Sequence, residues 1–394
     1  MPDFNNTQIA FEPKSNADLR RAEILFKTIK HPGLVKILKG MANAAMAIKF
    51  PIGWAVKPTL YKQFVGGETL DDCKPTLEHL KSYGVSSIFD YSAEGGSSYE
   101  DIVRTFDEIM HSIDFAKGNN DIIYAVFKPT AMTYDEVLEK ASLGTELNEN
   151  ERKEIEEFRE RMLKLCQRAY DNDVRILVDA EDYCFQAEID RVTENMMRKF
   201  NKKRAIVFTT LQMYRHDRLP YLRELYQDAV DNDYIIGMKF VRGAYMENER
   251  ERAKKMGYED PICKDKPATD ANYNAGLEFV LHHMDRFELF SGTHNEDSNY
   301  LLARLIDENN IDRKDPRIWF AQLYGMSDHI TYNLAKDGYN VTKYIPYAPV
   351  NTVLPYLIRR AEENTSMAGQ TGRELTLILK EKKRRKETER NKKV

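Results

Sequence analysis

Hydrophobic and polar residues follow one another along most of this chain in a regular rhythm of short apolar runs and longer amphipathic segments. Eight apolar runs rich in β-branched and aromatic residues are expected to be strands. They lie at residues 86–91, 122–127, 175–180, 205–212, 235–241, 287–292, 317–325 and 341–348. Each run is followed by a segment with helical periodicity, so the chain alternates between strand and helix.

The strand runs are apolar almost throughout, as in parallel strands that are buried on both faces. Eight such strand–helix units predict an α/β fold, a (β/α)8 barrel of the TIM type. A doubly wound open sheet is the main alternative. It would usually carry a glycine fingerprint after its first strand, and the sequence contains no G-x-G-x-x-G or G-x-x-x-x-G-K-[ST] motif.

Residues 1–80 are expected to form a helical arm ahead of the barrel. An amphipathic run extends from Asn16 through Ile29, and a small apolar helical segment at 42–48 is followed by the breakers Pro51 and Gly53. Residues 64–69 read as a turn, after which Thr69 or Asp71 could cap the next helix. The barrel domain is then expected at 81–375, and a basic tail at 376–394.

Three segments interrupt or extend the rhythm. The charged stretch within 134–172 is expected to be an exposed helix with i,i+4 ion pairs. The connection 247–270 could be a mobile cover over one end of the barrel. The tail from Lys380 to Val394 holds nine basic and three acidic side chains and is expected to be a solvated or frayed helical extension.

The segment 354–364 is expected to be an amphipathic helix near the C-terminus. One stripe carries Tyr356, Arg359, Arg360 and Glu363, and the opposite stripe is apolar. Periodicity alone favours a solvated charged face. The other interpretation is an anion site, because two neighbouring guanidinium groups become favourable when a carboxylate or phosphate lies between them.

Composition narrows the class of protein. The formal net charge is -4 over 394 residues. The tail is net positive and the rest of the chain is net negative, so no bulk field attracts nucleic acid to the body of the protein. Four scattered cysteines without a C-x-x-C pair predict no metal site and a reducing compartment. The N-terminus resembles neither a signal nor a transit peptide, and no apolar stretch is long enough for a spanning helix. We therefore expect a cytoplasmic protein.

Polar side chains stand at the carboxyl end of nearly every predicted strand, where barrels of this type build their active sites. They are Asp90, Lys128, Asp179, Glu181, Gln212, Tyr214, Lys239, Arg242, Thr293, His294, Asn295, Gln322, Tyr324 and Tyr347. Singly, each could be structural; Asp179 could cap a helix, and a lone histidine such as His294 is more often structural than catalytic. Together with Arg359 and Arg360, the cations predict a ligand with two anionic parts, such as a dinucleotide pyrophosphate plus a small carboxylate.

Several short blocks at these strand ends carry a family resemblance: FVGGET, VFKPTAM, LVDAED, TLQMYR, KFVRGAY, GTHN, QLYGM and YAPVNTVLPYLIRRAEEN. From about Phe64 to about Arg373 the chain resembles the proline dehydrogenases (proline oxidases), the flavin-dependent barrel enzymes of proline catabolism. Met246 after GAY and the short spacing from Tyr347 to Tyr356 make it similar to the monofunctional, mitochondrial-type branch.

The resemblance implies specific roles for residues. The substrate would be bound by Lys128, Leu323, Tyr347, Tyr356, Arg359, Arg360 and Glu363. FAD would be bound by Ala180, Gln212, Lys239, Arg242, Gly243, Ala244, Thr269, Thr293, His294 and Asn295. Asp179 and Lys239 would be catalytic, with Lys239 donating near flavin N5, at a position where bacterial members commonly have arginine.

The implied reaction is the oxidation of L-proline to Δ1-pyrroline-5-carboxylate by hydride transfer from C5 to flavin N5, the first step of proline catabolism to glutamate. The electrons would pass to a quinone. We expect no nucleic-acid partner and no covalently linked aldehyde dehydrogenase domain; peripheral contact with the inner membrane is left open. The alternatives are a hydroxyproline dehydrogenase, disfavoured by the bulk of Tyr347, a methylenetetrahydrofolate reductase-like flavin barrel, and a non-catalytic binding protein.

Overall fold

The computed structural model of the protein describes residues 1–31, 33, 35, 40, 53–92, 98–366 and 368–392. Within these ranges, the side chains of Ala55 and of residues 362–371 are not described. The helical segment expected at 42–48 lies outside the described residues, as does the side chain of Glu363.

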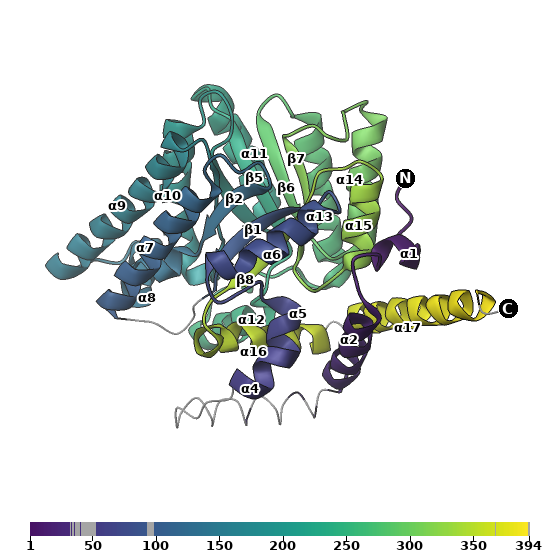
Figure 1. Cartoon of the computed structure of the whole chain (residues 1–394). Coiled ribbons are helices and arrows are strands. Elements are labelled where there is room, and N and C mark those ends of the chain that lie inside the picture. Colours follow the sequence, from purple (N-terminus) through teal and green to yellow (C-terminus); the bar gives the residue numbers. More distant parts are fainter. Residues whose placement is uncertain are drawn as a thin grey trace. The chain divides into compact units, whose positions relative to one another are not determined.

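Eight strands follow the chain in order and close into a barrel, β1 to β8 (Figure 1). Their bounds are β1 (Ser86–Tyr91), β2 (Ile122–Phe127), β3 (Arg175–Val178), β4 (Val207–Gln212), β5 (Ile236–Val241), β6 (Phe287–Gly292), β7 (Ile318–Leu323) and β8 (Val341–Tyr347). The prediction of a (β/α)8 barrel is confirmed, and the open doubly wound sheet is excluded. Every strand lies within two residues of its expected position, because an apolar run buried on both faces ends where polar residues begin.

Helices precede, separate and follow the strands (Figure 1). Before β1 lie α1 (Thr7–Ala10), α2 (Asn16–Ile29), α4 (Gly53–Val56), the π-helical turn η1 (Lys57–Tyr61), α5 (Lys62–Phe64) and α6 (Leu70–Lys81). Between the strands lie α7 (Tyr99–Ala116), the 3-10 turn η2 (Pro129–Met132), α8 (Asp135–Leu143), α9 (Glu149–Asp171), α10 (Tyr183–Phe200), α11 (Arg218–Asp231), α12 (Met246–Met256), α13 (Lys266–His282), α14 (Glu296–Glu308) and α15 (Asp328–Lys336). After β8 come α16 (Val350–Ser366) and α17 (Ala368–Asn391).

Capping boxes explain where several helices begin. In α2, α6, α7 and α9, a Ser, Thr or Asn side chain accepts from the third backbone N–H of the helix, and an acidic side chain there accepts from the cap in return. Of the two caps expected for α6, the structure selects Thr69, which pairs with Asp72.

The described residues form two compact units. Those of 88–91 and 98–321 make the central unit, and those of 1–87, Ser92 and 322–392 make the terminal unit. The domain division expected at 80/81 and 375/376 stays a prediction; α17 runs through the second of these positions.

The central unit carries the parallel ladder from β2 to β7. Tyr124 of β2 makes edge-on ring contacts with Phe208 of β4 and Phe290 of β6, at centroid distances of 5.0 and 5.3 Å. All three rings are buried and come from alternate strands, as in the interior side-chain layers of this barrel type. Aromatic rings therefore fill this layer of the barrel interior.

Two segments of the central unit differ from expectation. The connection after Tyr134 forms two helices. Its charged stretch lies mostly in α9, which has the expected i,i+4 ion pairs but is amphipathic rather than exposed all round, with Ile155, Phe158 and Met162 buried on one face. In the connection 247–270, Ile262 and Cys263 are buried, and the backbone N–H of Cys263 donates to Tyr214 O at 2.7 Å. That connection is therefore anchored in its middle.

In the terminal unit, α17 packs against α2, and Figure 1 draws the two helices side by side. Their apolar cluster consists of Ala10, Phe11, Leu19, Ala22, Phe26, Leu375, Leu377 and Ile378. The expectation of a solvated tail is wrong for the first part of 380–394. Glu381 is fully buried, and the Arg385 guanidinium donates to the carbonyls of Phe11 and Lys14 at 2.8 and 2.9 Å. Helical spacing places Glu381 on the same face as Leu377 and Ile378.

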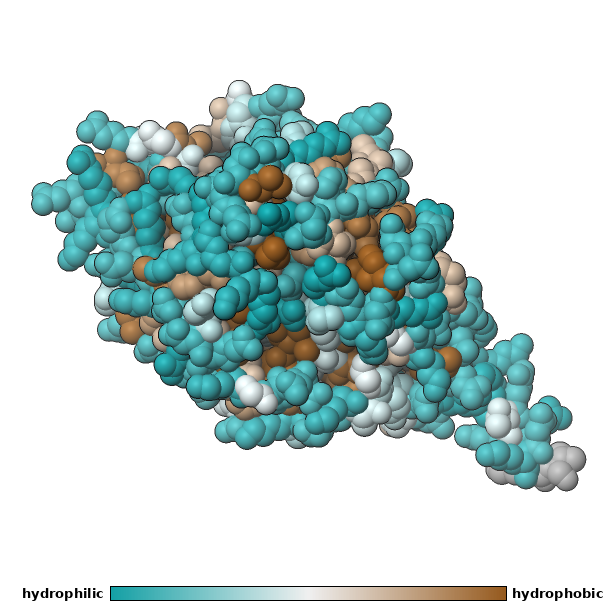
Figure 2. Space-filling model, turned by 90° about the horizontal axis from the view of Figure 1, so that it is seen from above, coloured by the Kyte–Doolittle hydropathy of each residue, from teal (hydrophilic) through white to brown (hydrophobic). Residues whose placement is uncertain are grey.

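The face of the molecule in Figure 2 is mostly hydrophilic, and its hydrophobic side chains lie in small separate groups. Among the helices that the structure describes, none combines the length and the apolar character that crossing a bilayer demands.

Replacing Phe26 by alanine should cost about 3–5 kcal/mol of unfolding free energy, because the ring is 1% exposed and its loss leaves a cavity between α2 and α17. Ile24→Ala is the matched control: Ile24 lies on the same helix but is 61% exposed, so its loss should cost less than about 0.5 kcal/mol. Equilibrium urea unfolding measures both. Equal losses for the two variants would contradict the packing of α17 on α2.

Candidate functional site

The carboxyl ends of β1 to β6, all in the central unit, carry the polar residues predicted from the sequence. Asp90 is in β1, Gln212 ends β4 and Lys239 is in β5, while Lys128, Asp179 and Thr293 follow β2, β3 and β6 directly. Because parallel strands run the same way, their carboxyl ends share one end of the barrel.

Two lysine–carboxylate pairs join neighbouring or alternate strands at this end. Lys128 Nζ lies 3.4 Å from Asp90 Oδ2, and Lys239 Nζ donates directly to Asp179 Oδ1. Lys239 is only 5% exposed, and its ammonium also lies 5.7 Å from the centre of the Phe290 ring. A buried ammonium needs a counter-charge, and Asp179 supplies it and fixes the position of the Lys239 side chain.

Glu181 is a further buried carboxyl at this end, noted as polar in the sequence but not assigned a role there. Its Oε1 accepts from Thr130 Oγ1 at 2.8 Å. Its backbone N–H donates to Gln186 Oε1 at 2.8 Å, and its carbonyl accepts from Gln212 Nε2 at 2.9 Å. Burial raises the pKa of the Glu181 carboxyl to about 7, and the nearby Lys128 ammonium limits the rise. The D-x-E spacing after β3 is the sequence signal that could have singled it out.

A buried polar network holds the backbone around Glu181. Gln186 Nε2 donates to Asp190 Oδ1 at 2.7 Å, and Asp190 Oδ2 accepts from Arg218 Nη1 at 2.7 Å. Arg218 and Arg215 both bond to Asp217, whose pKa lies far below its usual range because the two guanidinium groups outweigh the effect of burial. The network links α10 to α11 and leaves little freedom to the loop after β3.

Gln212 presents an acceptor with no partner in the described part of the chain. Its side chain is 2% exposed; Nε2 is used by the Glu181 carbonyl, while Oε1 is buried and accepts no hydrogen bond there. Buried polar atoms are nearly always satisfied. An orphaned acceptor at a barrel strand end is therefore the kind of atom that a bound group with an N–H donor would satisfy.

The structure brings Arg242 next to Thr293, and the Arg242 guanidinium already donates hydrogen bonds to three side chains. Its guanidinium donates to Thr293 Oγ1 at 2.6 Å, to Asp270 Oδ1 at 2.8 Å and to Ser298 Oγ at 3.0 Å, and it lies 4.5 Å from the centre of the Tyr273 ring. The planar group is thereby held rigidly.

The remaining predicted cofactor residues of the central unit differ in setting. Asn295 caps α14 and donates its backbone N–H to Thr293 Oγ1 at 3.1 Å. Thr269 is buried in α13, and its hydroxyl donates to Asp265 O at 3.3 Å. Ala180 and His294 are half-buried in loops after β3 and β6, and Ala244 is exposed.

Gly243, predicted to contact the cofactor, lies beside the Tyr214 ring. Its φ of +132° is rarely adopted by L residues, and a Cβ there would lie 2.5 Å from the Tyr214 ring. The glycine is required because that ring fills the space beside it.

In the terminal unit, the predicted substrate residues lie on β7, β8 and α16. Leu323 is half-buried at the end of β7, and Tyr347 is fully buried at the end of β8. On α16, Tyr356 is 4% exposed rather than part of a solvated stripe. The guanidinium carbons of Arg360 and Arg359 lie 5.2 and 5.9 Å from the centre of its ring, so this ring supports both cations.

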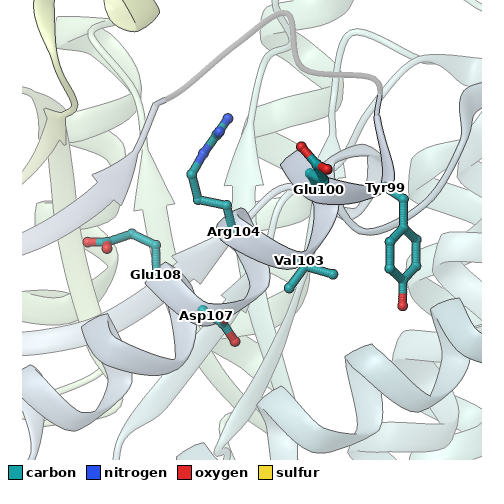
Figure 3. Close-up of a pocket in the computed structure, with 6 residues that line it drawn as sticks. All are labelled: Tyr99, Glu100, Val103, Arg104, Asp107 and Glu108. Atoms are coloured by element: carbon teal, nitrogen blue, oxygen red, sulfur yellow. The ribbon is translucent and has the colours of Figure 1, made fainter.

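Figure 3 shows a surface hollow of the central unit. It has a volume of about 570 Å³ and is lined along α7 by Tyr99, Glu100, Val103, Arg104, Asp107 and Glu108. None of these side chains was predicted to take part in the site. In the described part of the chain, no three His, Cys, Asp or Glu side chains are placed to hold a metal ion.

Because the pKa of Glu181 is about 7 in the folded protein and about 4.5 ordinarily, folding should hold a proton across the interval between them. The free energy of unfolding should then fall as pH rises through that interval, by up to about 1.4 kcal/mol per pH unit. Glu181→Gln should remove this slope. The unfolding free energy of the variant, measured with urea, should therefore rise relative to that of the wild type from pH 5 to pH 7.

Thr130→Val is the companion variant for Glu181. It deletes the hydrogen bond that favours the ionised carboxylate, so the pKa of Glu181 in the folded protein should rise. The fall in unfolding free energy should then continue to higher pH than in the wild type. A stability difference between wild type and Glu181→Gln that is constant from pH 5 to pH 7 would contradict the assignment.

Comparison with known proteins assigns this arrangement to a family. The model of the family described as proline dehydrogenase matches residues 73–373. Three relatives cover most of the chain. The carbapenem antibiotics biosynthesis protein CarD of Pectobacterium carotovorum subsp. carotovorum is 34% identical over 322 residues, which is 82% of this chain and 83% of the relative.

Mitochondrial proline dehydrogenase 1 of Dictyostelium discoideum is 32% identical over 385 residues, 86% of this chain and 67% of the relative. Hydroxyproline dehydrogenase of Xenopus laevis is 30% identical over 412 residues, 95% of this chain and 88% of the relative. The expected resemblance to mitochondrial-type members is thus confirmed.

Among solved structures, proline utilization A (PutA) from Bdellovibrio bacteriovorus, inactivated by N-propargylglycine, superimposes with a TM-score of 0.71 at 19% identity. The match covers 92% of this chain and 38% of that one, so this chain spans well under half of that protein. At this identity the similarity supports the barrel fold. The family match over most of the chain, with the strand-end residues described above, shows that the chain belongs to the proline dehydrogenase family.

Proposed function

We propose that this protein oxidises L-proline to Δ1-pyrroline-5-carboxylate with FAD as cofactor, the first step of proline catabolism to glutamate. The observation that carries the proposal is the pair Arg359 and Arg360, held over the Tyr356 ring on α16 of a chain that belongs to this family. Paired guanidinium groups suit a small carboxylate.

The residues of the central unit fit a flavin dinucleotide. Gln212 Oε1 is a buried acceptor without a partner in the described residues. Lys239 is a cation suited to a ring that gains negative charge on reduction, and Arg242 is a cation suited to a pyrophosphate. In the proposal, the group is held by Ala180, Gln212, Lys239, Arg242, Gly243, Ala244, Thr269, Thr293, His294 and Asn295. When bound, FAD supplies the two-electron acceptor, taking hydride from proline C5 at its N5 and passing the electrons on to a quinone.

The protein's own side chains bind and orient the substrate in this proposal. Arg359 and Arg360 hold the carboxylate, and Lys128 supplies a further positive charge. Leu323, Tyr347 and Tyr356 provide apolar area for the ring, and Glu363 would orient the arginines.

Asp179 and Lys239 act as one unit. The carboxylate holds the lysine side chain in place, and the ammonium favours electron acceptance at the cofactor. We place the activity in the cytoplasm, with the quinone reached at the surface of the inner membrane.

The visible spectrum of the purified protein tests the proposal. Anaerobic L-proline should bleach the flavin absorption, whereas NADH should leave it unchanged; bleaching by NADH alone would favour the methylenetetrahydrofolate reductase-like alternative. A colourless protein that cannot be reconstituted with FAD would refute the cofactor assignment, and a flavoprotein that proline does not reduce would refute the substrate.

Arg359→Met and Arg360→Met should each raise the KM for proline by about tenfold to a hundredfold, because each removes a charge-assisted hydrogen bond to the carboxylate. The matched control is Arg390→Met on the exposed surface of α17, which should leave KM unchanged. Steady-state kinetics on flavin-normalised enzyme measures all three. An unchanged KM in both α16 variants would show that the carboxylate binds elsewhere.

The second candidate, hydroxyproline dehydrogenase, is favoured by the similarity to the Xenopus enzyme over nearly the whole chain. We nevertheless expect kcat/KM to be at least about tenfold higher for proline than for trans-4-hydroxyproline, because the fully buried Tyr347 crowds the place of a ring hydroxyl. Tyr347→Ser should reduce the ratio of kcat/KM for proline to that for trans-4-hydroxyproline. Equal or better kcat/KM of the wild type on trans-4-hydroxyproline would reverse the choice.

A further inference from the structure

The turn between β7 and α15, residues 323–328 of the terminal unit, has an unusual backbone. Gly325 has φ +79° and Ser327 has φ +51°, so two of three consecutive positions are left-handed. Serine in this conformation is strained, and a Cβ at Gly325 would lie 2.0 Å from the carbonyl oxygen of Gln63. Such a turn persists only where its surroundings hold it.

One brace comes from the barrel strand beside the turn. Lys343 of β8 is 1% exposed, and its ammonium donates to Met326 O at 2.5 Å and to Leu323 O at 3.4 Å. It also pairs with Asp328 Oδ1 at 3.0 Å. Lys343 therefore ties the first and last residues of the turn to β8.

Three more braces come from outside the barrel. Lys14, just before α2, lies 3.3 Å from Asp328 Oδ2. Gln63 of α5 donates to the carbonyl of Gly325 at 2.7 Å. Glu374 of α17 accepts the backbone N–H of Ser327. These side chains come from positions 14, 63 and 374, before and after the barrel strands in the chain.

The Asp328 carboxylate in the turn lies between two ammonium groups, those of Lys14 and Lys343. Burial acts to raise the pKa of Asp328, but Lys14 and Lys343 outweigh it and hold the pKa at about 2, so the residue stays ionised. Burial raises the pKa of Glu374, and the nearby His329 limits the rise. With a charged partner on each side, the turn has one favourable arrangement rather than several.

The turn begins at Leu323, which the proposed function places against the substrate ring. The Leu323 carbonyl accepts from both Lys343 and the N–H of Met326, so its backbone belongs to the same hydrogen-bonded set as Ser327. A change in the turn is therefore transmitted to the position of the leucine side chain.

We infer that Glu374 and Lys14 are positioning residues for substrate-ring recognition: by bracing the β7–α15 turn they fix Leu323, so that α17 and the N-terminal arm set which ring sizes are accepted. This inference rests on the proposed function. It gives the segments on either side of the barrel a role in specificity, in addition to their packing against one another.

Glu374→Leu is the informative change, because it removes the acceptor of the Ser327 N–H while keeping side-chain bulk. Glu374→Gln retains an acceptor oxygen and should restore most of the wild-type behaviour. The matched control is Glu381→Leu, on the same face of α17 about two turns later. Glu381 is fully buried and pairs with Arg384 and Arg385, but none of its described partners lies in the turn.

The experiment measures kcat and KM of the full-length, FAD-loaded enzyme for L-proline and for its six-membered homologue, L-pipecolate. Glu374→Leu should raise the KM for proline more than it lowers kcat, and should narrow the proline-to-pipecolate ratio of kcat/KM by about threefold or more. Loss of folded protein alone would lower kcat by the same factor for both substrates and leave the ratio of their kcat/KM values unchanged. Glu381→Leu should therefore leave the ratio unchanged, whatever stability it loses.

Hydrogen exchange gives a reading independent of turnover. The peptide containing Ser327 should exchange faster in Glu374→Leu than in Glu381→Leu. Lys14→Met provides a second variant if Glu374→Leu does not fold, and it should shift the substrate ratio in the same direction.

An active wild type whose Glu374→Leu or Lys14→Met variant keeps the ratio, or whose Glu381→Leu variant shifts it equally, overturns this inference alone. A flavin-loaded wild type that does not oxidise proline overturns the proposed function and this inference with it.

Discussion

A buried ammonium needs a counter-charge beside it, and this requirement organises the charged pairs at the strand ends of the barrel. Lys239 lies almost out of solvent in β5 and is held by Asp179 after β3, two strands away. In a barrel whose interior is filled by side-chain layers, alternate strands contribute to the same layer. The pair therefore depends on closure of the barrel, which brings both strands to one interior level.

The same requirement explains why the strand ends are so rich in hydrogen bonds. Lys128 forms an ion pair with Asp90, and Arg242 donates hydrogen bonds to Asp270 and Thr293. The Glu181 backbone is hydrogen-bonded to the side chains of Gln186 and Gln212. Groups fixed in this way are set before a ligand arrives, so little reorganisation is needed when charge moves. Two groups at the strand ends differ from these. Gln212 Oε1 has no partner among the residues that the structure describes, and burial raises the pKa of the Glu181 carboxyl to about 7.

The terminal unit applies the same physics to a backbone turn. Asp328 is ionised because Lys14 and Lys343 flank it, and Glu374 supplies the acceptor for the strained Ser327. Residues far apart in the sequence thus converge on residues 323–328, where β7 ends and α15 begins. The α17 helix can reach the turn because its apolar face is already packed on α1 and α2.

The amino-acid sequence by itself determined the eight strands, the barrel and the family, because these depend on local patterns: apolar runs and short blocks at strand ends. The choice of Thr69 over Asp71 as the cap of α6 was made by the structure. The pairing of Lys239 with Asp179, the Tyr214 ring beside Gly243, the buried Glu381 and the braces on the β7–α15 turn were decided only by the tertiary structure. The partners in these contacts are separated by a few residues to several hundred. Which of them meet depends on strand register and on helix packing, and neither leaves a periodic signal in the chain.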